Sequence, residues 1–297
     1  MLIDFKFQNF RLFNDMQTFS MVKSKGDENT NNAFIIDEKK DFGLLKSTAI
    51  YGPNAGGKSN FFKAILTMKN IIIGSFQYGD NLPLVPFKLN SESKVQPSEF
   101  EITIIANNIR YQYGFSADSE QIYDEWLFAF PKGHAQKWFE RAWDKENKDH
   151  VWRFSNFLHG SKQIWRDSTR KNALFLSTAV LLNSEQLKPL FDWFKNILQM
   201  CDSSGFGSFF TKELCLNEGK KSVLKFLKAA DLNISDIKAK REDLSNPKLP
   251  SYFPDTIRSA LSEEFKGKTK ITLETVHTDS TGHDVTFDYD DESDGTQ

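Results

Sequence analysis

A glycine-rich stretch that ends in a lysine and a serine is the clearest chemical pattern in the sequence. Residues 52–59 read Gly-Pro-Asn-Ala-Gly-Gly-Lys-Ser and fit the phosphate-loop (P-loop) pattern G-x-x-x-x-G-K-[ST]. Its glycines permit backbone angles closed to other residues, so successive N–H groups can turn inward around a phosphate. In such a loop Lys58 is expected to reach the β- and γ-phosphates and to stabilise charge on the transferred phosphoryl group, while Ser59 holds Mg²⁺. The predicted binding residues are Gly52, Pro53, Asn54, Ala55, Gly56, Gly57, Lys58, Ser59 and Asn60.

A second pattern lies at the end of the sequence, where Ser293, Gly295 and Gln297 have the spacing S-x-G-x-Q. Three fixed positions recur by chance, but this motif follows a predicted strand hairpin far downstream of a P-loop. A glycine lets the backbone approach a phosphate closely, and a serine hydroxyl can donate a hydrogen bond to it. The alternative is an acidic disordered tail, because acidic residues surround the motif.

Together the two motifs resemble those of ABC-type ATPase heads related to the DNA-repair and chromosome-structure ATPases. Those heads share G-x-N-x-x-G-K-S, and Asn54 occupies the asparagine position here. The chain resembles in particular the bacterial stand-alone AAA15-type or OLD-like ATPases. The resemblance extends over the whole chain through softer matches at residues 9–11, 82–87, 111–115, 181–184 and 292–296.

The resemblance implies ATP and Mg²⁺ as cofactors and a homodimer or higher assembly. Ser293, Gly295 and Gln297 of one protomer would then cover the γ-phosphate held by another. It also implies that Arg11 approaches the nucleotide, although an ordinary surface arginine is an equal alternative. Such ATPases are frequently encoded beside an effector such as a nuclease in phage defence. Two other uses stay open, namely DNA maintenance with a duplex bound across the dimer, and a scaffold that binds ATP without hydrolysing it.

The sequence departs from this family at its C-terminal end. No apolar run ending in Asp-Glu occurs, so the Walker B strand is missing, and no D-loop or switch histidine follows. We interpret residues 290–292 as a hinge, and Gln96 is only a weak candidate for the Q-loop. The expectation is therefore that the sequence is truncated before Walker B, as the N-terminal portion of a longer polypeptide, with the catalytic glutamate beyond Gln297.

The elements expected to position the P-loop are a strand at residues 48–51 and a helix at residues 58–73. Antiparallel strands are predicted near the N-terminus, and a hairpin is predicted around Asn107-Asn108. The fold class is α/β, an ABC-ATPase-type head with a mixed sheet, an antiparallel N-terminal lobe and a mostly helical insertion. Further helices are predicted at residues 172–182, 184–200, 220–230 and 255–265, and further strands at 125–130, 270–278 and 284–289. The predicted domains are residues 1–130 for the first part of the head, 131–267 for the insertion, and 268–297 for strands that return to the head.

Three tryptophans, Trp138, Trp143 and Trp152, lie on two short strand-like runs. We interpret them mainly as the cover of a small sheet. The alternative is a base-stacking platform for nucleic acid, because basic residues follow the tryptophans in the sequence. Those basic residues are Lys162, Arg166, Arg170 and Lys171.

The composition limits which partners, locations and cysteine chemistry remain possible for the protein. A net charge of -2 over 297 residues gives no global attraction to nucleic acid. No apolar run reaches the roughly 18 residues that cross a bilayer, and the N-terminus has no signal-peptide pattern, so we expect no membrane partner and a cytoplasmic location. Cys201 and Cys215 form no C-x-x-C pair, which favours free thiols over a disulfide or a zinc site.

Overall fold

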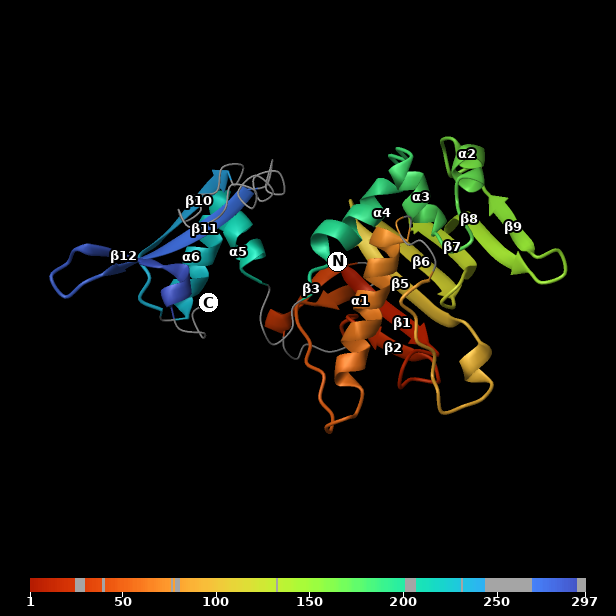
Figure 1. Cartoon of the computed structure of the whole chain (residues 1–297), viewed down its shortest axis with the longest axis horizontal. Helices are drawn as coiled ribbons and strands as arrows, with labels where there is room; N and C mark the ends of the chain where they lie inside the picture. Colours follow the sequence, from red (N-terminus) through yellow and green to blue (C-terminus); the bar gives the residue numbers. More distant parts are fainter. Residues whose placement is uncertain are drawn as a thin grey trace, which may run out of the picture. The chain divides into compact units, whose positions relative to one another are not determined.

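The computed structural model describes residues 1–24, 30–38, 41–75, 77, 81–131, 133–200, 207–230, 232–243 and 269–292. These residues divide into two compact units, Met1–Gln199 and Met200–Gln297. Each unit contains its own sheet and its own helices (Figure 1).

A seven-stranded sheet forms the first unit, and its strands pair in the order β2-β1-β5-β6-β7-β8-β9. All of these pairs are antiparallel. The strands are β1 (Leu2–Gln8), β2 (Gln17–Ser20), β5 (Ser98–Ala106), β6 (Ile109–Ala117), β7 (Ile122–Phe130), β8 (Gln136–Asp144) and β9 (Asp149–Phe154). The connections between consecutive strands from β5 to β9 are short. They explain the antiparallel pairing of these strands, because a tight hairpin can join only antiparallel strands.

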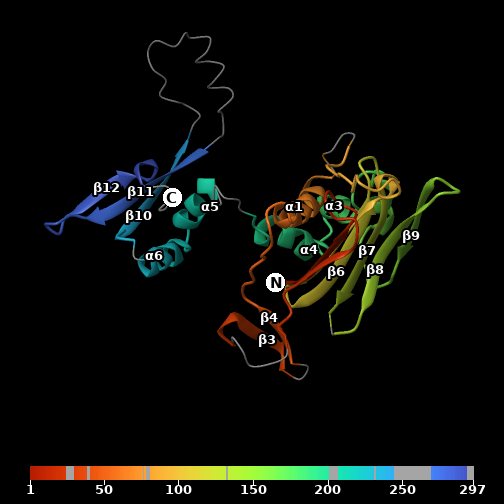
Figure 2. The same cartoon turned by 90° about the horizontal axis from the view of Figure 1, so that it is seen from below.

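Helices cover one face of this sheet (Figure 2). The largest is α1 (Lys58–Gly74), which begins at the P-loop lysine as predicted and buries Ala64, Met68 and Ile71. Its C-terminal end is tied to α3, since the hydroxyl of Ser177 donates to the carbonyl of Ile72 at 2.5 Å. The other helical segments of this unit are α2 (Lys162–Asp167), α3 (Phe175–Leu181), α4 (Lys188–Asp192) and a π-helical turn, η4 (Trp193–Ile197).

The prediction of a strand at residues 48–51 is wrong. These residues are irregular and exposed, with Tyr51 91% exposed, and no strand of the described chain pairs with them. The strand that precedes the P-loop lies earlier, as β4 (Phe42–Leu45), and pairs antiparallel with β3 (Ala33–Asp37). Leu44 on β4 is 1% exposed, so this earlier run buries an apolar side chain against a partner and residues 48–51 do not.

The second unit has a three-stranded antiparallel sheet in the order β10-β11-β12. Its strands are β10 (Asp236–Asp243), β11 (Thr269–Thr278) and β12 (Asp284–Asp288), and its helices are α5 (Gly207–Leu216) and α6 (Lys220–Ala229). Cys215, Ile234, Ile237 and Leu273 form its buried core. We expected β11 and β12 to return to the first sheet, but they pair with β10, a strand that the sequence pattern did not predict.

Other expectations met mixed outcomes. The hairpin at Asn107-Asn108 is confirmed, with φ values of +47° and +60° in its two turn residues. The tryptophan-bearing strands β8 and β9 are the last two strands at one edge of the large sheet, with β9 outermost, and do not form a separate small sheet. The helix predicted at residues 255–265 lies outside the described residues. Parallel pairs, which a mixed sheet requires, do not occur among the described strands. No helix in the described part of the chain is long and apolar enough to cross a membrane.

Candidate phosphate-binding site

The P-loop turns sharply before it enters α1. Ala55 has φ +62° and Gly57 has φ +91°, and the N–H of Gly56 donates to the carbonyl of Pro53 at 3.1 Å. Gly57 is the N-cap residue of α1, and no side chain caps the helix. The uncapped N-terminus of α1 therefore lies at the centre of the loop. It carries a partial positive charge.

The backbone N–H groups of this turn are free to bind a ligand. Those of Gly57, Lys58, Ser59 and Asn60 have no hydrogen-bond acceptor among the described residues. Intrahelical bonding begins with the N–H of Phe61, which donates to Gly57 at 2.9 Å. Several N–H groups at a helix N-terminus fit the oxygens of a phosphate group.

Lys58 adds a full charge to the same loop. Its Nζ donates to the carbonyls of Gly52 at 2.6 Å and of Pro53 at 2.8 Å. These two bonds hold the ammonium group of Lys58 over the same loop that carries the free backbone N–H groups. The donor set of the site is thus cationic and suited to a polyphosphate.

Ser59 is exposed, and its hydroxyl has no hydrogen-bond partner among the described residues. No group of three or more His, Cys, Asp or Glu side chains in the described chain could hold a metal ion. In P-loop sites Mg²⁺ is held by the loop serine together with a Walker B aspartate and phosphate oxygens, and Ser59 occupies the serine position of that set.

Two glycines of the loop cannot be replaced without a clash. A Cβ atom at Gly56 would lie 2.9 Å from the carbonyl oxygen of Pro53. A Cβ atom at Gly57 would lie 2.7 Å from Cζ of Phe13, and the positive φ of Gly57 disfavours a side chain in any case. Both glycines are therefore required by the shape of the loop.

Arg11 lies in the turn that follows β1, two residues before Phe13. Its backbone has φ +55°, its N–H donates to the carbonyl of Val85 at 2.9 Å, and its guanidinium lies 5.5 Å from the ring centre of Phe10. Its Nε is buried without a hydrogen-bond partner. The structure thus places Arg11 in a turn that contacts the P-loop through Phe13. The other predicted residues, Ser293, Gly295 and Gln297, lie outside the described part of the chain.

Two further expectations concern Gln96 and the acidic segment at residues 290–292. Gln96 contributes its backbone carbonyl, which accepts from Nδ2 of Asn9 at 2.8 Å. Glu292 accepts hydrogen bonds from the hydroxyl of Thr275 and from Nε2 of His277, and these bonds lower the pKa of Glu292. These bonds join the carboxylate to β11, and the interpretation of the segment as a hinge stays a prediction.

Of the three tryptophans of the alternative base-stacking platform, Trp138 is buried, and Trp143 and Trp152 are half-buried. Trp138 is 4% exposed and packs against Tyr111, which agrees with the interpretation of these aromatics as sheet cover. Arg166 pairs with its neighbour Asp167 at 2.9 Å, and Arg170 donates to the carbonyl of Ser75.

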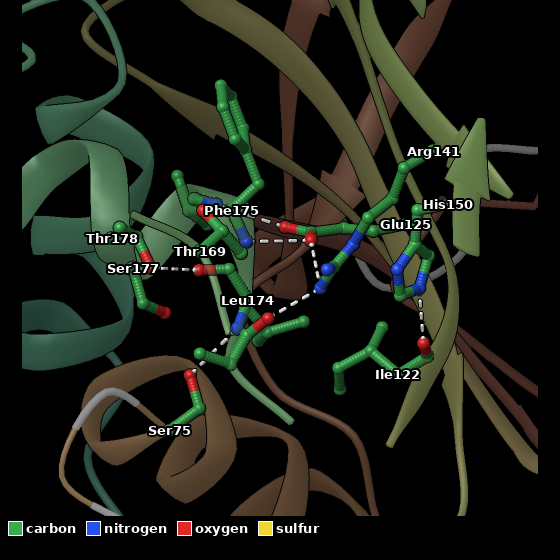
Figure 3. Close-up of polar contacts among 12 residues, drawn as sticks. Ser75, Ile122, Glu125, Arg141, His150, Thr169, Leu174, Phe175, Ser177 and Thr178 are labelled. Carbon is green, nitrogen blue, oxygen red and sulfur yellow. Dashed lines mark hydrogen bonds and ion pairs between the residues drawn. The ribbon is translucent and has the colours of Figure 1, made fainter. Parts of the chain in front are cut away.

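A buried ionic cluster, which the sequence pattern did not predict, lies between the sheet and α3 (Figure 3). The carboxylate of Glu125 accepts from Arg141 at 3.0 Å and from the hydroxyl of Tyr113 at 2.9 Å. It also accepts from the backbone N–H groups of Phe175 and Leu176 at the start of α3. Both charged side chains are completely buried, so this cluster joins α3 to the sheet and does not face a ligand.

The comparisons with known proteins bear on this site. A family model described as "AAA domain, putative AbiEii toxin, Type IV TA system" matches residues 47–297. The match contains the whole P-loop. No curated protein gave a match.

Proposed function

Because the chain belongs to this family of AAA domains, which have the α/β P-loop ATPase fold, we propose that residues 52–60 bind ATP with Mg²⁺ and that the protein hydrolyses it. The observation that carries the proposal is the convergence of four N–H groups without acceptors and the Lys58 ammonium on one loop. The N–H groups of the loop would hold phosphate oxygens, and Lys58 would stabilise charge on the transferred phosphoryl group. Mg²⁺, when bound through Ser59, would neutralise phosphate charge.

The finer proposal concerns assembly. We propose that the ATPase is of the ABC type and forms a dimer or higher assembly around ATP, with Ser293, Gly295 and Gln297 of one protomer completing the site of another. The S-x-G-x-Q spacing supports this proposal. The Asn54 position within the P-loop supports it as well.

The biological role of ATP hydrolysis by this protein is also a proposal. The family description names a putative toxin of a type IV toxin–antitoxin system. We propose that ATP-dependent closure of the assembly controls a separately encoded effector, such as a nuclease, in anti-phage defence. No observation specifically favours DNA maintenance, because Arg166 and Arg170 already have partners within the protein.

Lys58→Ala tests the core of the proposal. We expect this variant to lose at least about 100-fold in kcat for ATP hydrolysis, since a charge aimed at the transferred phosphoryl group is removed. Lys63→Ala is the matched control, because Lys63 is an exposed lysine on the same helix. Steady-state phosphate release by both variants and the wild-type protein provides the measurement. Wild-type turnover in Lys58→Ala would end the assignment, and ATP binding without turnover by the wild-type protein would favour the scaffold function.

A further inference from the structure

The turn between β1 and β2 has an unusual backbone. Phe10 and Phe13 exchange two hydrogen bonds, of 2.8 and 2.9 Å, and the N–H of Asn9 donates to the carbonyl of Asn14 at 3.3 Å. Within it Asn9 has φ +51° and Arg11 has φ +55°. The left-handed conformation is unfavourable for most residues other than glycine and asparagine, so surrounding contacts must hold Arg11 in this turn.

Asn9 supplies those contacts. Its Nδ2 donates to the carbonyls of Ser93 and Gln96, each at 2.8 Å, and its Oδ1 accepts from the N–H of Phe87 at 3.0 Å. The hydroxyl of Ser98 donates to the Asn9 carbonyl at 2.6 Å. Asn9 is 5% exposed, so water does not compete strongly for these bonds. The side chain therefore fixes the turn to residues 87–98, which include the short helix η3 (Ser93–Val95).

Phe13 connects the turn to the P-loop. A Cβ atom added to Gly57 would lie only 2.7 Å from Cζ of Phe13. The ring of Phe13 is therefore in close contact with Gly57, the last loop residue before α1. The ring is itself held edge-to-face by Phe7 of β1, with ring centres 5.0 Å apart. Phe7 of β1 thus packs against Phe13, and Phe13 packs against the backbone of Gly57.

We propose that Phe13 and Asn9 are positioning residues for the phosphate site. Phe13 holds Gly57 in its left-handed conformation, which aims the free N–H groups of Gly57, Lys58 and Ser59 inward. Asn9 holds the turn that carries Phe13. The ligand class is the triphosphate of the proposed function, on which this inference rests.

The first test compares nucleotide affinity with stability. Phe13→Ala should raise the Kd of a fluorescent ATP analogue by at least about tenfold, because misplaced donors lose much of their effect. Phe13→Leu should restore most of the affinity, since it refills the space beside Gly57. Phe154→Ala is the matched control, because Phe154 is also a half-buried aromatic residue but lies on β9, at the opposite edge of the sheet from β2. Its Tm should fall about as far as that of Phe13→Ala, with an unchanged Kd.

A second readout needs no nucleotide. Amide hydrogen exchange at residues 61–64 should be at least about tenfold faster in Phe13→Ala than in the wild-type protein, because the N–H of Phe61 loses a fixed acceptor at Gly57. It should be unchanged in Phe154→Ala. If the wild-type protein binds no nucleotide, the proposed function fails, and this exchange result still decides whether Phe13 positions the loop.

Asn9→Asp tests the other half of the inference. The aspartate keeps the size of the side chain but cannot donate to the carbonyls of Ser93 and Gln96. We expect faster exchange at residues 61–64 and a higher Kd for the ATP analogue, in the same direction as for Phe13→Ala. Unchanged exchange and affinity in both Phe13→Ala and Asn9→Asp would overturn the inference, and so would equal losses of affinity in Phe13→Ala and Phe154→Ala.

Discussion

His150 shows how one side chain can make the stability of the first unit depend on pH. Its Nε2 lies 2.7 Å from the carbonyl oxygen of Ile122, and its ring packs against Trp143 and Trp152. Burial, and secondarily the charge of Arg141, lower its pKa. The hydrogen bond to Ile122 opposes that shift, and so do the carboxylates of Asp149 and Asp124, but none of them reverses it. The neutral ring is therefore the form that the fold favours.

This shift predicts a loss of stability in mild acid. Because the pKa of His150 is lower in the folded than in the unfolded protein, the unfolded chain binds the proton first as the pH falls below about 6.5. The free energy of unfolding should then decrease by at most about 1.4 kcal/mol per pH unit from this group. His150→Gln should remove that contribution while leaving the other titrating groups in place. Urea unfolding of both proteins between pH 7.5 and pH 5 measures it, and parallel pH dependences would contradict the prediction.

At the scale of elements, α3 is fixed to the sheet by a buried charge pair. Glu125 of β7 binds the first N–H groups of α3 and the guanidinium of Arg141 on β8. Burial lowers the pKa of Arg141, and it raises the pKa of Tyr113, whose hydroxyl is the third partner of the carboxylate. Removing one partner would leave an uncompensated charge in a water-free interior.

We therefore expect Arg141→Met to lower the free energy of unfolding by about 3–5 kcal/mol. The double variant with Glu125→Gln should be less destabilised than the sum of the two single variants, because neither charge is then left alone. Glu140→Gln is the control, since Glu140 pairs with the exposed side chain of Lys137 and such surface pairs contribute about 0–1 kcal/mol. Chemical denaturation of the four variants provides the values. A cost for Arg141→Met no larger than that for Glu140→Gln would show that the buried pair contributes little.

At the scale of the whole molecule, each unit has a core of its own, and among the described residues the core of the second unit is much the smaller. All six tryptophans lie between residues 126 and 193, within the first unit. Cys215 belongs to the small core of the second unit, and burial raises the pKa of its thiol. Tryptophan fluorescence and thiol reactivity therefore report on different units.

We predict that the two signals change at different urea concentrations. Cys215 should become reactive first, because the described residues of the second unit bury far fewer apolar side chains than those of the first. The experiment uses the full chain with Cys201→Ser, so that a single thiol is measured. Coincident transitions would show instead that the protein unfolds as one cooperative body.

The features that the sequence predicted correctly are those whose cause is local. The P-loop pattern, the start of α1 at Lys58 and the Asn107-Asn108 hairpin follow from glycine, periodicity and turn chemistry within a few residues. The candidate P-loop residues were therefore found from their spacing alone. Their role as ligands of ATP stays a prediction.

Tertiary structure decided the features whose cause is distant in the sequence. Residues 48–51 have a strand-like composition, but strand formation requires a pairing partner and none of the described residues provides one. The partner of β11 is β10, and nothing in the local pattern of either strand specified it. Phe13 lies 44 positions from Gly57 in the sequence, and Glu125 lies 50 from Phe175. Local conformation depends on neighbouring residues, whereas contacts of this kind exist only once the sheet has brought distant segments together.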